Sequence, residues 1–136
     1  MLNKVQFIGR LGADPEVRYT PDGKQVTTFR LASDHVRKDK SGSPIKETEW
    51  LACVTWDKLA EICGQYLVKG RLVYVEGRLR TRSWEDKDGV KRYKTEAILH
   101  DMKMLEKKQA ESGDGAGTNV PDNYYPDSDL GDDVPF

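Results

Sequence analysis

The sequence of 136 residues predicts an all-β fold with one short helix, and three observations lead to this expectation. Apolar and polar residues alternate over several segments, as they do in strands that bury one face. Glycine, proline and aspartate cluster between these segments, where turns are expected. Only one segment has apolar residues at the spacing of an amphipathic helix.

The first two strands are expected at residues 3–11 and 25–33. The first alternates apolar and polar residues, and the second, QVTTFRLAS, is rich in β-branched residues, which favour strands. Residues 21–24, PDGK, have proline and glycine in the positions that a β-turn requires. Residues 34–46, DHVRKDKSGSPIK, are polar and basic, so we expect an extended loop or a hairpin tip.

The third strand and the helix follow directly. In residues 47–56, ETEWLACVTW, both faces of the strand carry apolar groups, so one face is core and the other is an aromatic surface or an interface. Asp57 is expected to cap the helix. The helix has one apolar stripe, made of Leu59, Ile62, Cys63, Tyr66 and Leu67.

The last two strands are expected at residues 71–84 and 91–104, joined as a hairpin through Asp88-Gly89. The chain then has five strands, with the helix between the third and the fourth. This is the order of elements in the OB-fold, a five-stranded Greek-key barrel that binds oligonucleotides. We therefore predict an OB-fold for residues 1–108.

The charge of the chain is divided between a basic body and an acidic end. Residues 1–108 hold all 22 Lys and Arg against 16 Asp and Glu, whereas residues 109–136 hold 7 acidic residues and no Lys or Arg. The acidic segment is rich in Gly, Asp, Pro and Ser, so it is expected to be a disordered tail. Residues 109–131 would be a flexible linker. Residues 132–136, DDVPF, would form an acidic tip that ends in apolar residues. The basic body suggests a polyanionic partner.

One face of the predicted hairpin combines positive charge with an aromatic ring. Because side chains alternate across a strand, Arg78, Arg80, Arg82 and Trp84 should project to the same side. Single-stranded nucleic acid needs such a surface, with cations for phosphates and flat rings for bases. Solvated arginines beside a half-buried tryptophan would give the same pattern. Trp50 and Trp56 on the third strand, with Arg37 and Lys38 in the 34–46 segment, favour binding.

Other functional classes find little support in the sequence. His35 and His100 have no metal-binding spacing, and no nucleophile or phosphate-loop motif is present. Cys53 and Cys63 have no CxxC arrangement and suggest two buried thiols in a reducing cytoplasm. No apolar run is long enough to span a membrane, and the first residues lack the features of a signal peptide. We expect a cytoplasmic, non-catalytic protein without a cofactor or metal.

Four segments resemble the bacterial single-stranded DNA-binding protein (SSB) family. They are NKVQFIGRLGADPEVRYTPDGKQV, TEWLACVTWDKLAE, YLVKGRLVYVEGRLRTRSWED and the terminal DDVPF, in that order along the chain. The resemblance implies an OB-fold that assembles as a homotetramer and carries wrapped single-stranded DNA. It places Trp50, Trp56 and Trp84 at the family's base-stacking positions. It also implies that the tip recruits replication, repair and recombination proteins, through Asp132, Asp133, Val134, Pro135 and Phe136.

The chain also departs from the family pattern. Val36 stands where a further stacking tryptophan is common, with His35 as the nearest ring. Leu51 replaces a histidine that is familiar at the subunit interface. The linker is short, which leaves open a shorter paralogue used in DNA uptake. An OB-fold that binds RNA, a structural oligomerisation domain and a nuclease are further alternatives.

Overall fold

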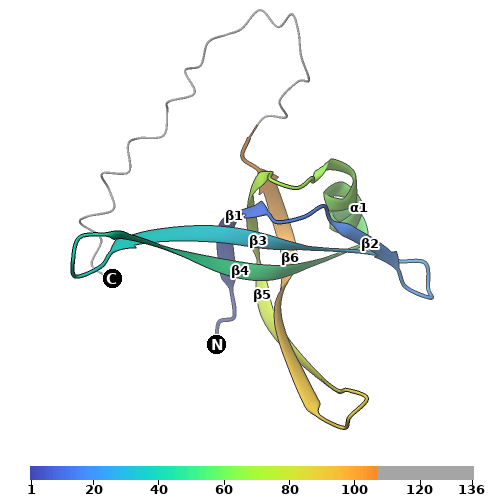
Figure 1. Cartoon of the computed structure of the whole chain (residues 1–136). Coiled ribbons are helices and arrows are strands. Elements are labelled where there is room, and N and C mark those ends of the chain that lie inside the picture. Colours follow the sequence, from blue (N-terminus) through green and yellow to red (C-terminus); the bar gives the residue numbers. More distant parts are fainter. Residues whose placement is uncertain (107–136) are drawn as a thin grey trace, which may run out of the picture. The chain divides into compact units, whose positions relative to one another are not determined.

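The computed structural model describes residues 1–106, and Figure 1 shows how the elements are arranged. The elements are β1 (Val5–Leu11), β2 (Glu16–Tyr19), β3 (Gln25–Lys38), β4 (Pro44–Trp56), α1 (Asp57–Tyr66), β5 (Leu72–Glu85) and β6 (Lys91–Met104). The described chain falls into two compact units. One comprises Met1–Asp34 and Thr48–Glu106, and His35–Glu47 belongs to the other. The predicted tail and tip lie outside the described residues.

Five long strands form a closed barrel, so the predicted OB-fold is confirmed. The sheet order is β1-β5-β6-β4-β3-β2, and an additional pairing of β1 with β3 closes it. At this closure Leu11 lies opposite Leu31, and Arg10 lies opposite Ala32. Gly9 makes the close approach possible, because a Cβ on this residue would lie 2.6 Å from the carbonyl oxygen of Ala32.

The structure has one strand that was not predicted, and two predicted strands are longer than expected. β2 was not expected, and it pairs with the first residues of β3, from Glu16 opposite Thr28 to Tyr19 opposite Gln25. Its four residues are all exposed, so no apolar alternation marks it as a strand. Of the two structures expected for residues 34–46, an extended loop or a hairpin tip, the structure has the hairpin tip, since β3 continues to Lys38 and β4 begins at Pro44.

The core of the barrel is small and apolar. Leu31, Val73 and Val75 are completely buried, as is the Cys63 thiol, and Cys53 is almost so. Burial raises the pKa of Cys53 to about 12 and that of Cys63 to about 11, because a thiolate is poorly solvated there. Both thiols therefore stay protonated and unreactive at neutral pH.

Helix α1 packs on the barrel through Ala60 and Cys63, its two buried residues. The buried Thr27 hydroxyl donates a 2.7 Å hydrogen bond to the Ala60 carbonyl. The predicted cap was wrong: Trp56 is the N-cap residue, and no side chain caps the helix. Asp57 is instead the first helical residue and adopts a left-handed φ of 55°.

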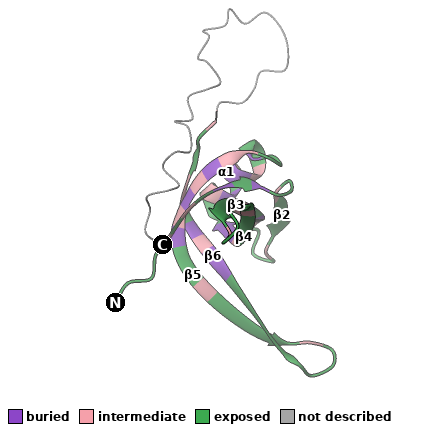
Figure 2. Ribbon diagram, turned by 60° about the vertical axis from the view of Figure 1, so that its left-hand side comes forward, coloured by how far each residue is buried: buried purple, intermediate pink, exposed green. Residues whose placement is uncertain are grey.

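Half of the β5–β6 hairpin projects beyond the barrel. Figure 2 shows buried residues along the part of β5 and β6 that borders the core, and exposed residues along the part that ends in the turn. The Asp86 carboxylate closes this turn by accepting 2.9 Å hydrogen bonds from the backbone N–H groups of Asp88 and Val90. Gly89 supplies the positive φ of 76°. The predicted hairpin through Asp88-Gly89 is confirmed.

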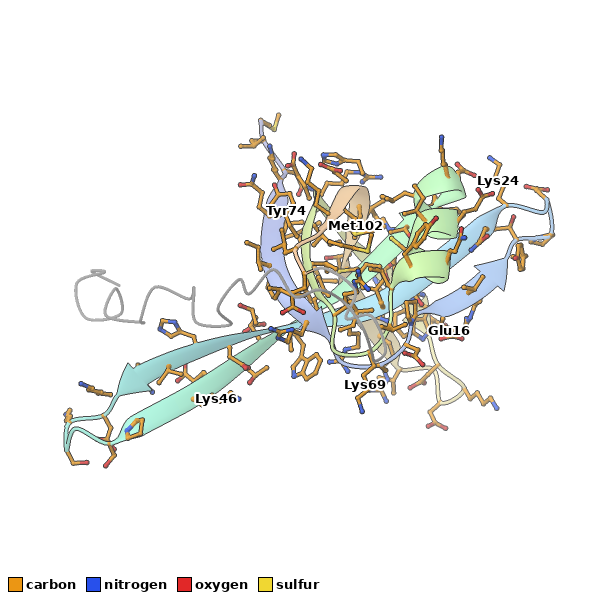
Figure 3. The ribbon with its side chains drawn as sticks, turned by 90° about the horizontal axis from the view of Figure 1, so that it is seen from above. Glu16, Lys24, Lys46, Lys69, Tyr74 and Met102 are labelled. Atoms are coloured by element: carbon orange, nitrogen blue, oxygen red, sulfur yellow. The ribbon has the colours of Figure 1, made fainter. Side chains whose placement is uncertain are left out.

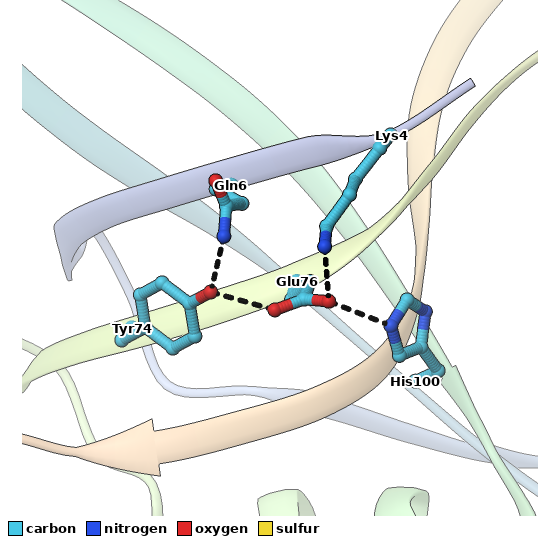
Figure 4. Close-up of polar contacts among 5 residues, drawn as sticks. All are labelled: Lys4, Gln6, Tyr74, Glu76 and His100. Atoms are coloured by element: carbon cyan, nitrogen blue, oxygen red, sulfur yellow. Dashed lines mark hydrogen bonds and ion pairs between the residues drawn. The ribbon is translucent and has the colours of Figure 1, made fainter. Parts of the chain in front are cut away.

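A polar cluster joins β1, β5 and β6 on the outside of the barrel (Figure 4). The Glu76 carboxylate accepts a 2.7 Å hydrogen bond from the Tyr74 hydroxyl and lies 3.0 Å from the Lys4 ammonium group. His100 Nε2 lies 3.2 Å from the same carboxylate, and Gln6 donates to the Tyr74 oxygen. The hydrogen bond from Tyr74, followed by those from Lys4 and His100, lowers the pKa of Glu76 to about 2.

Candidate nucleic-acid interface

An open groove of about 650 Å³ lies on the surface of the barrel. It receives side chains from β2, β3, β4, β5 and β6, and from the segment that follows β1. Two of its residues are tryptophans, five are cationic and three are acidic. These are Trp50 and Trp56, then Arg18, Arg30, Arg80, Arg82 and Lys94, then Asp14, Glu16 and Glu96. The groove therefore joins exposed indole rings to an excess of positive charge.

Strand β4 presents both tryptophans to this groove. The strand alternates as predicted: Trp50 and Trp56 are exposed and line the groove, whereas Cys53 and Thr55 are buried. Trp50 is 44% exposed and Trp56 38% exposed, so neither ring fills the barrel core. At a rise of ~3.3 Å per residue, six residues separate the two rings by about 20 Å along the strand. The rings can therefore contact different nucleotides of one bound strand.

The Trp50 ring is held by two neighbours that the sequence did not single out. The Arg30 guanidinium carbon lies 4.9 Å from the ring centroid, a cation–π distance. Gly12 lies beside the ring, and a Cβ added to this glycine would be 2.6 Å from Cζ3 of the indole. Only glycine, which has no Cβ, leaves room for the Trp50 ring at this position. A glycine at the end of a strand gives no sign of such a contact in the sequence.

The β5–β6 hairpin supplies most of the cations. Arg80 and Arg82 line the groove, and the Arg82 guanidinium carbon lies 5.0 Å from the centroid of the Trp84 ring. In the antiparallel register Arg82 lies opposite Lys94, and Trp84 lies opposite Arg92. Directly opposite residues share a face, so Lys94 and Arg92 lie on the same side as the β5 cations; Lys94 lines the groove, whereas Arg92 pairs with Asp86 at 3.0 Å and does not line it. The position of the turn could have revealed them, because it sets the register.

The remaining predicted binding residues are placed as follows. Arg78 lies opposite Ile98 and is exposed, but it is not among the residues that line the groove. Trp84 is 42% exposed and stands further along the hairpin. Arg37 and Lys38 belong to the unit that contains residues 35–47, where Arg37 Nε pairs with the Glu47 carboxylate at 2.9 Å.

Acidic residues that line the groove reduce its positive charge. On β2, Arg18 pairs with Glu16 at 2.6 Å, and both residues line the groove; the side chains are drawn in Figure 3, where Glu16 is labelled. This ion pair is exposed and contributes little to stability. Arg18 can therefore exchange Glu16 for a phosphate at low cost.

The described residues contain no group of three or more His, Cys, Asp or Glu side chains placed to hold a metal ion. Near the β5–β6 turn, the Asp86 carboxylate serves the turn itself by accepting hydrogen bonds from the backbone N–H groups of Asp88 and Val90. Within residues 1–106, no helix is long and apolar enough to cross a membrane.

Comparison with known proteins agrees with the fold. Residues 2–105 match the model of the single-strand binding protein family. The chain belongs to this family. It is 54% identical over 113 residues to single-stranded DNA-binding protein 1 of Chlorobaculum tepidum, a match that covers 82% of this chain and 70% of the relative.

Two further matches extend the comparison to 91% of the chain and to a solved structure. Single-stranded DNA-binding protein 1 of Xylella fastidiosa is 46% identical over 132 residues, covering 91% of this chain and 96% of the relative. The structure described as "Plasmodium falciparum SSB complex with ssDNA" is 34% identical, with a TM-score of 0.72. It covers 78% of this chain and 97% of that one. The expected resemblance to SSB is thus confirmed.

Proposed function

We propose that this protein binds single-stranded DNA without sequence preference, protects it, and performs no catalysis. The observation that carries the proposal is the pair of exposed tryptophans in a groove with five cationic side chains. Every base has an aromatic face, so stacking on tryptophan tolerates any sequence. Membership of the single-strand binding protein family and the DNA-bound structural relative support the same function.

The binding energy has two physical sources. Each stacked base contributes ~1–3 kcal/mol, and Trp50 and Trp56 supply two such platforms in the groove. Neutralising each phosphate releases counterions and adds a slope of about −0.7 to the dependence of log K on log salt for single strands. Trp84, with Arg82 over its ring, extends the stacking surface along the hairpin.

Titration with oligo-dT of increasing length tests this function directly. Stacking should quench the fluorescence of the 3 tryptophans until the binding site is filled, so the saturating length also measures the site. Tryptophans that remain unquenched by any length of oligo-dT would contradict the proposal and favour a purely structural domain. Matched DNA and RNA strands distinguish the alternative of an RNA-binding OB-fold, which would prefer the RNA.

We also propose that the chain forms a homotetramer. Among the described strands, residues 5–9 of β1 pair only with β5, which leaves one edge of this strand open. An open strand edge is a template for pairing with a second chain. Ile8 on this strand is 52% exposed, as expected for a residue that a partner subunit would cover. Light scattering should give the mass of four chains, and a monomeric mass at micromolar concentration would refute the assembly.

The terminal residues are proposed to recruit replication, repair and recombination proteins in the cytoplasm. A partner would need an apolar slot for Phe136, a cation for its carboxylate and a basic rim for Asp132 and Asp133. Deleting residues 134–136 should abolish capture of such partners while DNA affinity stays the same or rises slightly. A strong loss of DNA affinity would show that the tip has another role. A role restricted to DNA uptake remains the alternative.

A further inference from the structure

A single carboxylate lies between two arginines in the groove. Glu96 on β6 is only 4% exposed, although it lines a groove with an excess of positive charge. Its Oε1 atom accepts a 3.0 Å hydrogen bond from Arg80 Nη2 and lies 3.2 Å from Arg82 Nε. Arg80 is its direct cross-strand neighbour, and Arg82 is the next residue on the same face of β5.

The two arginines keep most of their hydrogen-bonding capacity. A guanidinium has five N–H donors, and the shared oxygen of Glu96 faces one nitrogen of each. The side chains of Arg80 and Arg82 remain 40% and 51% exposed. Arg80 Nε is buried and makes no hydrogen bond within residues 1–106, so the exposed part of this guanidinium is the part that can contact a ligand. The guanidinium groups are therefore fixed in place but still available to an anion.

Two guanidinium groups would repel each other without the carboxylate. A negative charge shared by both compensates this repulsion and holds the two groups close together. The resulting cluster has a net charge of +1 and can direct donors from two planar groups at one phosphate.

We propose that Glu96 is a positioning residue that holds Arg80 and Arg82 together as a binding site for one phosphodiester of the DNA strand. This inference rests on the proposed function of the groove. A phosphodiester is the ligand of matching chemistry, because guanidinium groups bind its two non-bridging oxygens through paired N–H donors. The bases on either side of this phosphate would then be guided towards the tryptophan rings.

Charge alone predicts the opposite effect of removing Glu96. Replacing a buried carboxylate by a neutral group makes the groove more positive, which strengthens the attraction of a polyanion. Loss of positioning instead separates the arginines and weakens binding. The sign of the change in affinity therefore decides between the two roles.

The experiment compares Glu96→Gln with the unchanged protein by the fluorescence anisotropy of labelled oligo-dT over a series of salt concentrations. We expect binding to weaken about tenfold, and the salt slope to shrink by about 0.7 as one phosphate contact is lost. Equal or tighter binding would overturn the proposal. Glu106→Gln is the matched control, because Glu106 also pairs with an arginine, Arg10, at 2.7 Å but does not line the groove.

A mutant cycle shows whether Glu96 acts through the arginines. In a chain that carries Arg80→Ala and Arg82→Ala, the additional change Glu96→Gln should no longer weaken binding; affinity should stay the same or rise, because only the effect of the lost negative charge is left. A persistent loss in that background would overturn the proposal. If Glu96→Gln does not fold, Arg80→Ala, Arg82→Ala and the double variant test the shared site on their own. A shared site predicts that the double variant loses less binding free energy than the sum of the two single losses. Additive losses would refute the shared site.

These outcomes are distinguishable from a failure of the proposed function. If the groove binds no DNA, oligo-dT leaves the tryptophans of the unchanged protein unquenched. If quenching occurs but Glu96→Gln binds as tightly as before, only the role of Glu96 is refuted.

Discussion

Gly12→Ala should weaken DNA binding while leaving the fold intact. The new Cβ would lie 2.6 Å from Cζ3 and 2.8 Å from Cη2 of Trp50. Carbon atoms in contact prefer separations of ~3.5–4.0 Å, so the ring must move by about 1 Å. The ring is 44% exposed and can move outward into solvent. The displacement therefore changes the stacking platform more than the barrel.

The size of the expected loss of affinity follows from the binding free energy that one stacked base contributes. Complete loss of stacking costs ~1–3 kcal/mol, so a displaced ring should cost about 1 kcal/mol, or about a fivefold loss of affinity. Gly12 does not have the left-handed φ of glycines such as Gly23 and Gly89, so alanine can adopt its backbone conformation. Stability should then stay constant or rise by ~0.4–1 kcal/mol, because alanine restricts the unfolded chain.

The assay is the fluorescence anisotropy of labelled oligo-dT, with thermal unfolding measured on the same samples. Trp50→Ala provides the background that isolates the mechanism, since Gly12→Ala should have no effect on affinity once the ring is gone. Unchanged affinity of the single variant would refute the reasoning. An equal loss in the background without the ring would refute it as well.

Three further predictions concern charge and burial. Glu76→Gln should lower Tm at pH 7, because the pKa of Glu76 in the folded protein, about 2, lies below its ordinary value of 4.5. The difference in Tm between the variant and the unchanged protein should disappear as pH falls from 4.5 to 2. A difference in Tm that stays constant over this range would contradict the prediction. Cys53 and Cys63 should not react with a thiol reagent at pH 8 until the protein is unfolded, because burial raises their pKa values, and rapid reaction of the folded protein would contradict the packing. Arg82→Ala should reduce the salt slope by about 0.7 and change the Trp84 emission, whereas an unchanged slope would exclude Arg82 from phosphate binding.

The barrel and the tryptophan face could be predicted because both depend on the period of a strand. Side chains alternate along β4, so the positions of Trp50 and Trp56 relative to Cys53 follow from counting residues. The hairpin turn at Asp88-Gly89 was equally readable, since its residues suit the turn that joins two strands.

Features without a local pattern were missed. The four residues of β2 are exposed on both faces, so the strand exists only through its pairing with β3. For residues 34–46 the polar sequence left an extended loop and a hairpin tip both open, because backbone pairing has no side-chain signal, and the structure has the hairpin tip. Asp57 has the side chain of a helix cap, but the chain enters α1 at Trp56 instead.

The contacts that complete the groove could not be predicted from the sequence, for a different reason. Gly12 and Arg30 meet the Trp50 ring from other parts of the barrel, and only the closed sheet brings them there. Lys94 and Glu96 are intermediate cases. The position of the hairpin turn sets the register of the two strands, with Lys94 opposite Arg82 and Glu96 opposite Arg80. The placement of Lys94 and Glu96 could therefore have been predicted from the sequence once the turn was located.

Gly64 shows how a residue can be understood only in three dimensions. By propensity alone it weakens α1 by roughly 1 kcal/mol relative to alanine. In the fold, a Cβ at this position would lie 2.9 Å from Cγ2 of Val17, so the glycine lets the helix approach β2 closely. The loss of helix propensity at Gly64 is offset by the close packing of α1 against β2.

The most direct test of the central claim is the affinity of the double variant Trp50→Ala and Trp56→Ala for labelled oligo-dT. Two stacking platforms of at least ~1 kcal/mol each predict a loss of about 30-fold or more. Tyr66→Ala is the matched control, because Tyr66 is a 50% exposed aromatic residue at the end of α1 that does not line the groove. Affinity of the double variant within twofold of the unchanged protein would show that the groove does not bind DNA by stacking.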